Sequence, residues 1–189
     1  MNYVSLYRRH CMNIFMKPIK KSLFSFFYAI VFIFTLTATP QFVVYGNVQH
    51  YNPAWQQIQE LLEFEFRVFE LTNIERVRYG LNPVAWSNDL AGISRMHSSD
   101  MATNDFFSHT GSDGASPGGR VWYAGIALSR VGENIAAGAI TPELTVAAWM
   151  MSPGHKAVIL NENFRYMGVG MYVFENSSWV FYITQKFGW

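Results

Sequence analysis

Two histidines and one glutamate in the second half of the sequence have side chains that could act together in chemistry. His109 follows two aromatic residues and a serine in a polar loop, and His155 follows the rigid tripeptide Ser-Pro-Gly. Glu133 stands between a glycine and an asparagine. Two imidazoles and a carboxylate can bind a divalent transition metal, with one position open for water. They can equally form a general-base arrangement in which the carboxylate orients one imidazole. The spacing does not separate these alternatives.

A further histidine, His97, is predicted to be structural. It falls on a helical face that is otherwise apolar, formed by Leu90, Ile93 and Met101 at steps of three and four. We therefore expect a buried, hydrogen-bonded imidazole rather than a ligand or a catalytic group. No GxSxG sequence indicates a serine nucleophile near the candidate histidines.

Aromatic residues raise the alternative of lipid binding. The candidates are Trp122, Tyr123, Trp179 and Tyr182. Aromatic side chains in strands and helices usually pack in the core or pair across strands. We therefore expect these four residues to be mainly core or strand-pair residues.

The elements that must position these residues begin with two helices. The apolar spacing after Pro53 predicts a helix that ends at Gly80, and Ser87 is a good N-cap for a second helix to about Asn104. The segment 105–119 is rich in Gly, Ser and Asp, which predicts a loop, and residues 120–124 are expected to form a short helix.

The remaining segments predict one more helix, a short helical turn and a terminal hairpin. Thr141 is a predicted N-cap for a helix to about Met151, followed by a helical turn over residues 155–160. Residues 131–135 are expected to be extended, and residues 166–174 and 179–187 to form an antiparallel hairpin. This order of elements predicts an α+β domain in which helices cover the sheet.

The N-terminal segment, residues 1–46, has the features of an export leader. Basic residues precede an apolar run from Leu23 to about Ala38, as in a signal peptide or an uncleaved N-terminal anchor. Residues 47–62 are expected to be a linker and the start of the first helix. The rest of the protein is then secreted, or anchored on the outer face of the membrane, which it contacts only through an uncleaved leader.

Composition narrows the class of protein further. The formal net charge is +1, so bulk electrostatics gives no reason to expect nucleic acid as a partner. Half of the residues are apolar and 17% are aromatic, which is enough for a core. The single cysteine, Cys11, lies in the leader, so the exported part has no disulfide.

Short motifs spread in order over residues 63–187 resemble the CAP superfamily, which comprises cysteine-rich secretory proteins, insect venom antigen 5 and plant pathogenesis-related proteins. The compact bacterial branch, with SCP-like domains, is the most similar. The motifs are Asn73–Arg76, Gly80–Pro83, Trp86, Phe106–His109, Gly132–Ala136, Trp149–His155 and Met167–Gly170. Each motif is weak alone, but the ordered set is specific.

The resemblance implies an SCP-like domain over residues 63–189, folded as an α-β-α sandwich with a small central antiparallel sheet. It also implies that His109, Glu133 and His155 line one cleft, where relatives can bind a divalent cation such as zinc. Many relatives have a second glutamate after the tryptophan-bearing helix. Here the sequence reads Trp149-Met-Met-Ser, so that carboxylate is missing.

Three functions remain open from the sequence. The first is a non-catalytic binding module for an extracellular ligand or an envelope component. The second is a hydrolase, of a protease-like kind, that uses a metal or a general base in the same cleft. The third is lipid or sterol binding. Fold alone does not decide between them.

Overall fold

The structure, a computed structural model, describes residues 53–139 and 141–189. Residues 54–189 form one compact unit. The predicted leader and the linker up to residue 52 lie outside the described residues. Within residues 53–139 and 141–189, no helix has both the length and the apolar character needed to cross a membrane.

Two of the described helices begin at the caps that the sequence predicts. Ser87 accepts a hydrogen bond from the backbone of Leu90, and Thr141 accepts one from the backbone of Leu144. The helices are α2 (Pro53–Arg78), α3 (Asn88–Thr103), α4 (Pro117–Tyr123), α5 (Pro142–Met151) and α6 (Pro153–Ile159). Helix α4 begins within the predicted loop, because Ser116 caps it and Pro117 suits a first turn.

The described strands form one four-stranded sheet in the order β1-β3-β4-β2. They are β1 (Ala85–Trp86), β2 (Val131–Ala137), β3 (Tyr166–Val173) and β4 (Phe181–Gly188). The predicted hairpin is present as β3 and β4, and β2 pairs antiparallel with β4. The two-residue β1 runs parallel to β3, so the sheet is mixed at that edge. The α+β fold class is confirmed.

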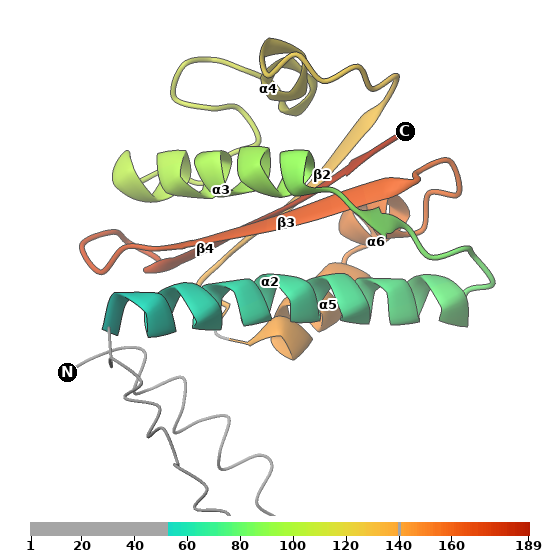
Figure 1. The fold of residues 1–189 in the computed structure, drawn as a ribbon, viewed down its shortest axis with the longest axis horizontal. Helices are drawn as coiled ribbons and strands as arrows, with labels where there is room; N and C mark the ends of the chain where they lie inside the picture. Colours follow the sequence, from blue (N-terminus) through green and yellow to red (C-terminus); the bar gives the residue numbers. More distant parts are fainter. Residues whose placement is uncertain (1–52, 140) are drawn as a thin grey trace, which may run out of the picture. The chain divides into compact units, whose positions relative to one another are not determined.

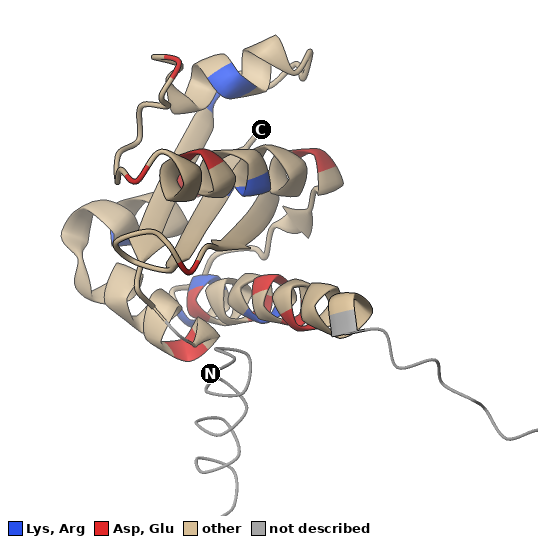
Figure 2. Ribbon diagram, turned by 90° about the vertical axis from the view of Figure 1, so that its left-hand side faces the viewer, with Lys and Arg blue, Asp and Glu red and all other residues tan. Residues whose placement is uncertain are grey.

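Helices cover both faces of the sheet (Figure 1). Helix α3 lies on one side, while α2 and α5 lie on the other. Residues 182–188 of β4 are all buried, as expected of a strand covered on both faces. Basic and acidic residues are interspersed along the helices, and neither sign gathers on one face in the view of Figure 2.

Two glycines allow α3 to lie directly on β3. A Cβ atom on Gly168 would stand 2.1 Å from the backbone nitrogen of Ala91, and one on Gly170 would stand 2.1 Å from that of Arg95. Ser98 donates a hydrogen bond to the Gly170 carbonyl at 2.9 Å. The Gly-x-Gly pattern of β3 therefore sets the distance between helix and sheet.

Arg76, which lies on α2, fixes the position of α6. Its buried guanidinium donates hydrogen bonds to the backbone carbonyls of Asn82, Ile159 and Asn161. The last two carbonyls lie at the C-terminal end of α6 and just beyond it. This arginine thereby joins α2 to the helix that carries His155.

The expectation for the aromatic residues is wrong for three of the four. Trp122 and Tyr123 are each 74% exposed, and Trp179 is 52% exposed. Tyr182 is fully buried, as expected. Helix α4 has only seven residues, and Val121 supplies its buried contact, so its neighbours Trp122 and Tyr123 face outward.

Candidate functional site

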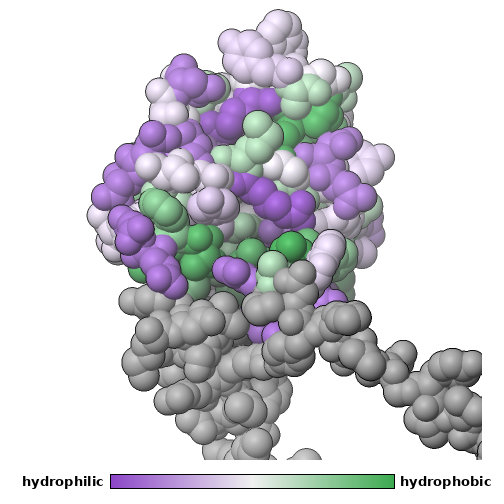
Figure 3. Space-filling view, turned by 60° about the vertical axis from the view of Figure 1, so that its left-hand side comes forward, coloured by the Kyte–Doolittle hydropathy of each residue, from purple (hydrophilic) through white to green (hydrophobic). Residues whose placement is uncertain are grey.

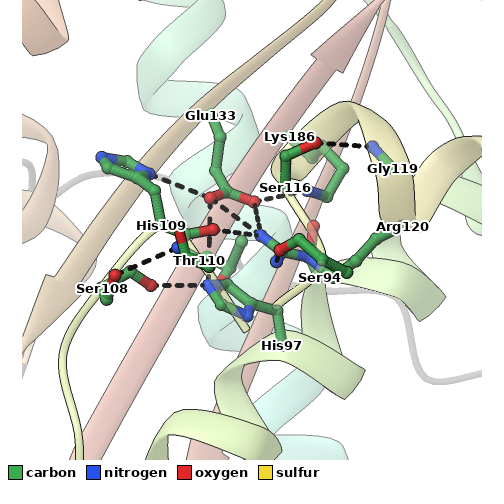
Figure 4. Close-up of polar contacts among 12 residues, drawn as sticks. Ser94, His97, Ser108, His109, Thr110, Ser116, Gly119, Arg120, Glu133 and Lys186 are labelled. Carbon is green, nitrogen blue, oxygen red and sulfur yellow. Dashed lines mark hydrogen bonds and ion pairs between the residues drawn. The ribbon is translucent and has the colours of Figure 1, made fainter. Parts of the chain in front are cut away.

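Glu133 is the centre of a buried polar network on the α3 side of the sheet (Figure 4). Its Oε1 accepts a hydrogen bond from Nδ1 of His109 at 2.9 Å. Its Oε2 accepts one from Arg120 at 2.8 Å and one from the Lys186 ammonium group. Both carboxylate oxygens are thus engaged by donors from a loop, a helix and a neighbouring strand.

The two cations reach Glu133 from different elements. Lys186 lies directly opposite Glu133 in the β2–β4 ladder, and its side chain is fully buried. Arg120 comes from α4 and also donates to the carbonyls of His109 and Ala115. One carboxylate therefore compensates two cations and holds α4, the histidine loop and β4 together.

Glu133 stays ionised at any ordinary pH. Burial alone would raise its pKa, but the hydrogen bond from His109 and the charges of Lys186 and Arg120 outweigh burial and hold the pKa at about 2. Burial lowers the pKa of Lys186, and the charge of Glu133 opposes this effect. A carboxylate with so low a pKa and so many donors is a poor general base.

His109 is oriented by this carboxylate. Because an ionised carboxylate only accepts hydrogen bonds, Nδ1 of His109 is the donor, and in the neutral ring Nε2 carries the free lone pair. The His109 side chain is 49% exposed, whereas that of Glu133 is 1% exposed. The pair therefore presents an oriented imidazole at the surface above a buried anion.

His97 holds the loop that carries His109. Its Nε2 donates to the carbonyl of Ser108 at 3.0 Å, and its side chain is buried. The predicted structural role is confirmed. Nε2 of His97 also lies 3.9 Å from Oε1 of Glu133. Burial lowers the pKa of His97 to about 4, despite the charge of Glu133, so the ring is neutral at pH 7.

This burial makes stability depend on pH. The folded His97 stays neutral between its folded pKa of about 4 and its ordinary value of 6.5, while the unfolded chain binds a proton in that range. The free energy of unfolding should therefore fall by about 3 kcal/mol as the pH falls from about 6.5 to about 4. Chemical denaturation at several pH values measures this slope.

The matched variant is His97→Gln, which keeps a donor for the Ser108 carbonyl without titrating. We expect a shallower slope above about pH 5.5, where Glu133, whose ordinary pKa of 4.5 applies in the unfolded chain, has barely begun to contribute. Equal slopes for the two proteins would contradict the assignment. His155, whose pKa burial also lowers, contributes in the same direction and is unchanged in the variant.

His155 lies near the start of α6, and Asn134 ties its backbone to β2. The Asn134 amide donates to the His155 carbonyl at 3.2 Å and to Gln185 at 3.0 Å. Since side chains alternate along a strand, Asn134 points to the face opposite Glu133. The charge of His109 lowers the pKa of His155, after burial, so the two imidazoles interact electrostatically.

The structure thus joins two of the three predicted residues directly. His109 and Glu133 share a hydrogen bond. Within the described residues, no hydrogen bond links the His155 imidazole to either of them. His109 and Glu133 therefore form a pair, and the backbone of His155 is held by Asn134 on the other face of β2.

A divalent cation requires several ligands with free lone pairs. The oxygens of Glu133 already accept hydrogen bonds from Arg120 and Lys186, and two cations beside them oppose a metal. In the part of the chain that the structure describes, no group of three His, Cys, Asp or Glu side chains could hold a metal. The three-residue ligand set does not fit, and Glu133 is better placed to orient His109. Zinc binding stays a prediction that rests on the two imidazoles.

Two members of the network, Arg120 and Lys186, were not assigned a role from the sequence. The position of Lys186 could have predicted a buried ion pair, because a lysine inside a strand that is buried on both faces requires a buried counter-ion. Nothing in the sequence predicted a buried contact for Arg120, because a basic residue in a short helix is usually solvated. Only the β2–β4 register shows which carboxylate Lys186 meets.

Comparison with known proteins places this architecture in a family. The sequence model of the cysteine-rich secretory protein family, CAP, matches residues 69–187. The chain belongs to this family. The CAP match includes His109, Glu133 and His155 as well as the two glycines that seat α3 on β3.

Two bacterial CAP relatives are clearly similar in sequence. The uncharacterized protein YkwD of Bacillus subtilis is 43% identical over 124 residues, which cover 66% of this chain and 46% of that protein. An extracellular protein from Bacillus anthracis with an SCP domain has a crystal structure with a TM-score of 0.65 and 32% identity. The match covers 72% of this chain and 43% of that one. This chain thus spans less than half the length of both relatives.

A further solved structure shares the fold. The outer surface protein of Borrelia burgdorferi has a TM-score of 0.56 at 21% identity, with 64% of this chain and 87% of that chain covered. The fold of this chain therefore matches part of the longer Bacillus anthracis chain and most of the Borrelia burgdorferi chain.

Proposed function

We propose that this CAP protein is an exported binding module that engages an extracellular ligand or an envelope component through the cleft of His109, Glu133 and His155, without turnover. The similar Bacillus anthracis protein is described as extracellular, which supports export. The leader predicted for residues 1–46 supports the same location, by secretion or by anchoring on the outer face of the membrane.

The state of Glu133 carries the non-catalytic part of the proposal. Its oxygens bind His109, Arg120 and Lys186, and its pKa is about 2. These contacts make Glu133 a fixed structural anion rather than a base. The hydroxyl of Ser108, beside His109, accepts a hydrogen bond from the Thr110 backbone and is not bonded to the imidazole. The imidazole of His109 is thus presented for binding.

Retention on cell envelopes tests the proposal. Purified protein, fluorescently labelled, is incubated with envelope fractions from a bacterial culture, and the bound fraction is measured. We expect His109→Ala to reduce the bound fraction about tenfold, as for a central contact residue. Val77→Ala, at an exposed position of α2, is the control and should bind like the wild type. Equal retention of His109→Ala and wild type would overturn the role of the cleft.

A hydrolase is the second candidate, favoured by the 2.9 Å contact between Nδ1 of His109 and Glu133. A carboxylate that orients an imidazole is the arrangement of general-base catalysis. A screen of peptide, ester and glycan substrates tests it. Turnover by the wild type that His109→Ala abolishes and Val77→Ala retains would establish the hydrolase and overturn binding without turnover.

Lipid binding has support from a different place in the fold. A groove of about 620 Å³ separates α2 from α3, and Ile58, Leu61, Leu62 and Met96 contribute apolar walls. Figure 3, in which the left-hand side of Figure 1 comes forward, shows apolar side chains gathered between polar ones. A fatty acid is the simplest occupant. Binding of a fluorescent fatty acid at background level would exclude this function.

A further inference from the structure

A second pocket lies beside the Glu133 network, between α3 and α4. Its volume is about 360 Å³, which falls at the small end of ligand sites of roughly 300–1,000 Å³. Apolar atoms of Ile93 and Met96 form one wall, and Tyr123 contributes from α4. Polar side chains complete the lining; they are His97, Asp100, Ser112, Asp113 and Arg120.

Two residues of this lining have buried polar atoms without partners. Nδ1 of His97 and Nε of Arg120 make no hydrogen bond among the described residues. His97 is 1% exposed. Because its Nε2 donates to the Ser108 carbonyl, Nδ1 is an acceptor, whereas Nε–H of Arg120 is a donor. A ligand that satisfies both atoms must both donate and accept hydrogen bonds, as hydroxyl groups do.

The lining carries charges of both signs, so an ionic ligand of either sign meets at least one like charge. Arg120 lines the pocket, so a cation meets a positive charge there, which Glu133 partly compensates. Asp100 and Asp113 also line the pocket, so an anion meets carboxylates. Hydrogen bonds from Ser112 outweigh burial and lower the pKa of Asp100, which keeps it ionised. A neutral polar ligand meets neither penalty.

An aromatic platform borders the pocket. Trp122 and Tyr123 are each 74% exposed and pack edge to face, with ring centroids 5.3 Å apart. Exposed adjacent aromatic residues at the rim of a pocket are a feature of binding surfaces. Asp113 is exposed nearby, with one oxygen accepting from the Ala115 backbone. The rim thus combines flat apolar rings with a carboxylate acceptor.

We infer that this pocket binds a neutral saccharide, whose hydroxyl groups bond the polar lining while its apolar ring face packs on Tyr123 or Trp122. The inference rests on the proposed binding function and names the chemical class of the ligand. Since the unpartnered atoms of His97 and Arg120 are buried, a small movement of the lining side chains accompanies binding.

Titration of the full chain with neutral trisaccharides tests the inference. The N-acetylated, neutral form of chitotriose, cellotriose and maltotriose are each added to the protein. The affinity is measured by calorimetry and by the NMR signals of His97. We expect binding by at least one of them, with a shift of the His97 ring signals. A fully deacetylated, cationic chitotriose and an anionic trigalacturonate should bind about tenfold more weakly than the neutral ligand. Absence of binding by all three neutral sugars, or tighter binding of either charged one, would overturn the inference.

Matched variants locate the site. Tyr123→Ala, Trp122→Ala and Asp113→Asn should each weaken binding, the aromatic changes by about tenfold. Trp179→Ala removes an aromatic residue that is 52% exposed but lies in the β3–β4 connection, and it should bind normally. Equal weakening by Trp179→Ala would contradict the placement of the sugar beside α4.

The result separates this inference from the proposed function. If envelope retention depends on His109 but no trisaccharide binds, the saccharide inference is wrong and the binding function stands. If a trisaccharide binds through Tyr123 while His109→Ala is retained normally on envelopes, the role of the cleft is wrong and the saccharide site stands.

Discussion

Replacement of Glu133 with glutamine is expected to lower the free energy of unfolding by about 3–5 kcal/mol, because it leaves buried cations without their counter-ion. The side chain of Lys186 is fully buried and that of Arg120 is 11% exposed, so water cannot compensate. Glutamine has nearly the same shape as glutamate, so the effect comes from the lost charge and from an amide NH2 that faces donors, rather than from a change in packing. Urea denaturation of wild type and Glu133→Gln measures the difference.

A second substitution separates charge from packing. Lys186→Met introduces an apolar chain of similar length, and the double variant Glu133→Gln, Lys186→Met removes both charges of the buried pair. We expect the double variant to recover part of the lost stability, since it removes one of the two cations that lose their counter-ion, while Arg120 keeps its charge without one. A loss below about 1 kcal/mol in Glu133→Gln would mean that the carboxylate does not compensate these cations.

The second large effect is expected at Gly168. Gly168→Ala should destabilise the protein by about 3 kcal/mol or more, because the new methyl group would stand 2.1 Å from the Ala91 backbone nitrogen. Backbone atoms of a helix cannot move aside as a flexible side chain can, so α3 itself must shift. Thermal and urea denaturation measure the loss, and a weakened contact between His97 and Ser108 should accompany it.

Gly92 provides the control within the same helix. A Cβ on Gly92 would meet no atom within 4 Å, so Gly92→Ala should stabilise α3 by about 0.5–1 kcal/mol through helix propensity. Opposite signs at the two glycines are the expected outcome. Similar destabilisation at both would show that α3 tolerates alanine poorly for a reason other than its contact with β3.

Local signals predicted most of the secondary structure. The caps Ser87 and Thr141 act over three residues, so the sequence around them is sufficient to place α3 and α5. The terminal hairpin also follows from local alternation and a short turn. The parallel pairing of β1 with β3 joins residues about 80 positions apart, and no local pattern indicates it.

The candidate site was predictable only in part, for the same reason. The resemblance of ordered motifs pointed to His109 and Glu133, which the structure joins. The cations that fix Glu133 come from α4 and β4, and their approach depends on strand register and helix placement. The exposure of Trp122 and Tyr123 was missed because a seven-residue helix is too short for its apolar pattern to define one buried face.

The pairing of Glu133 with Lys186 also affects how the chain selects one sheet during folding. Strand β2 lies at the end of the sheet, where slippage meets the least resistance. A shift of one residue would place Asn134 opposite Lys186 and turn Glu133 toward the other face. The ammonium group would then be buried beside a neutral amide, at a cost similar to that of deleting its partner. The ion pair therefore favours the strand alignment in which Glu133 meets Lys186, Arg120 and His109 over one shifted by a residue.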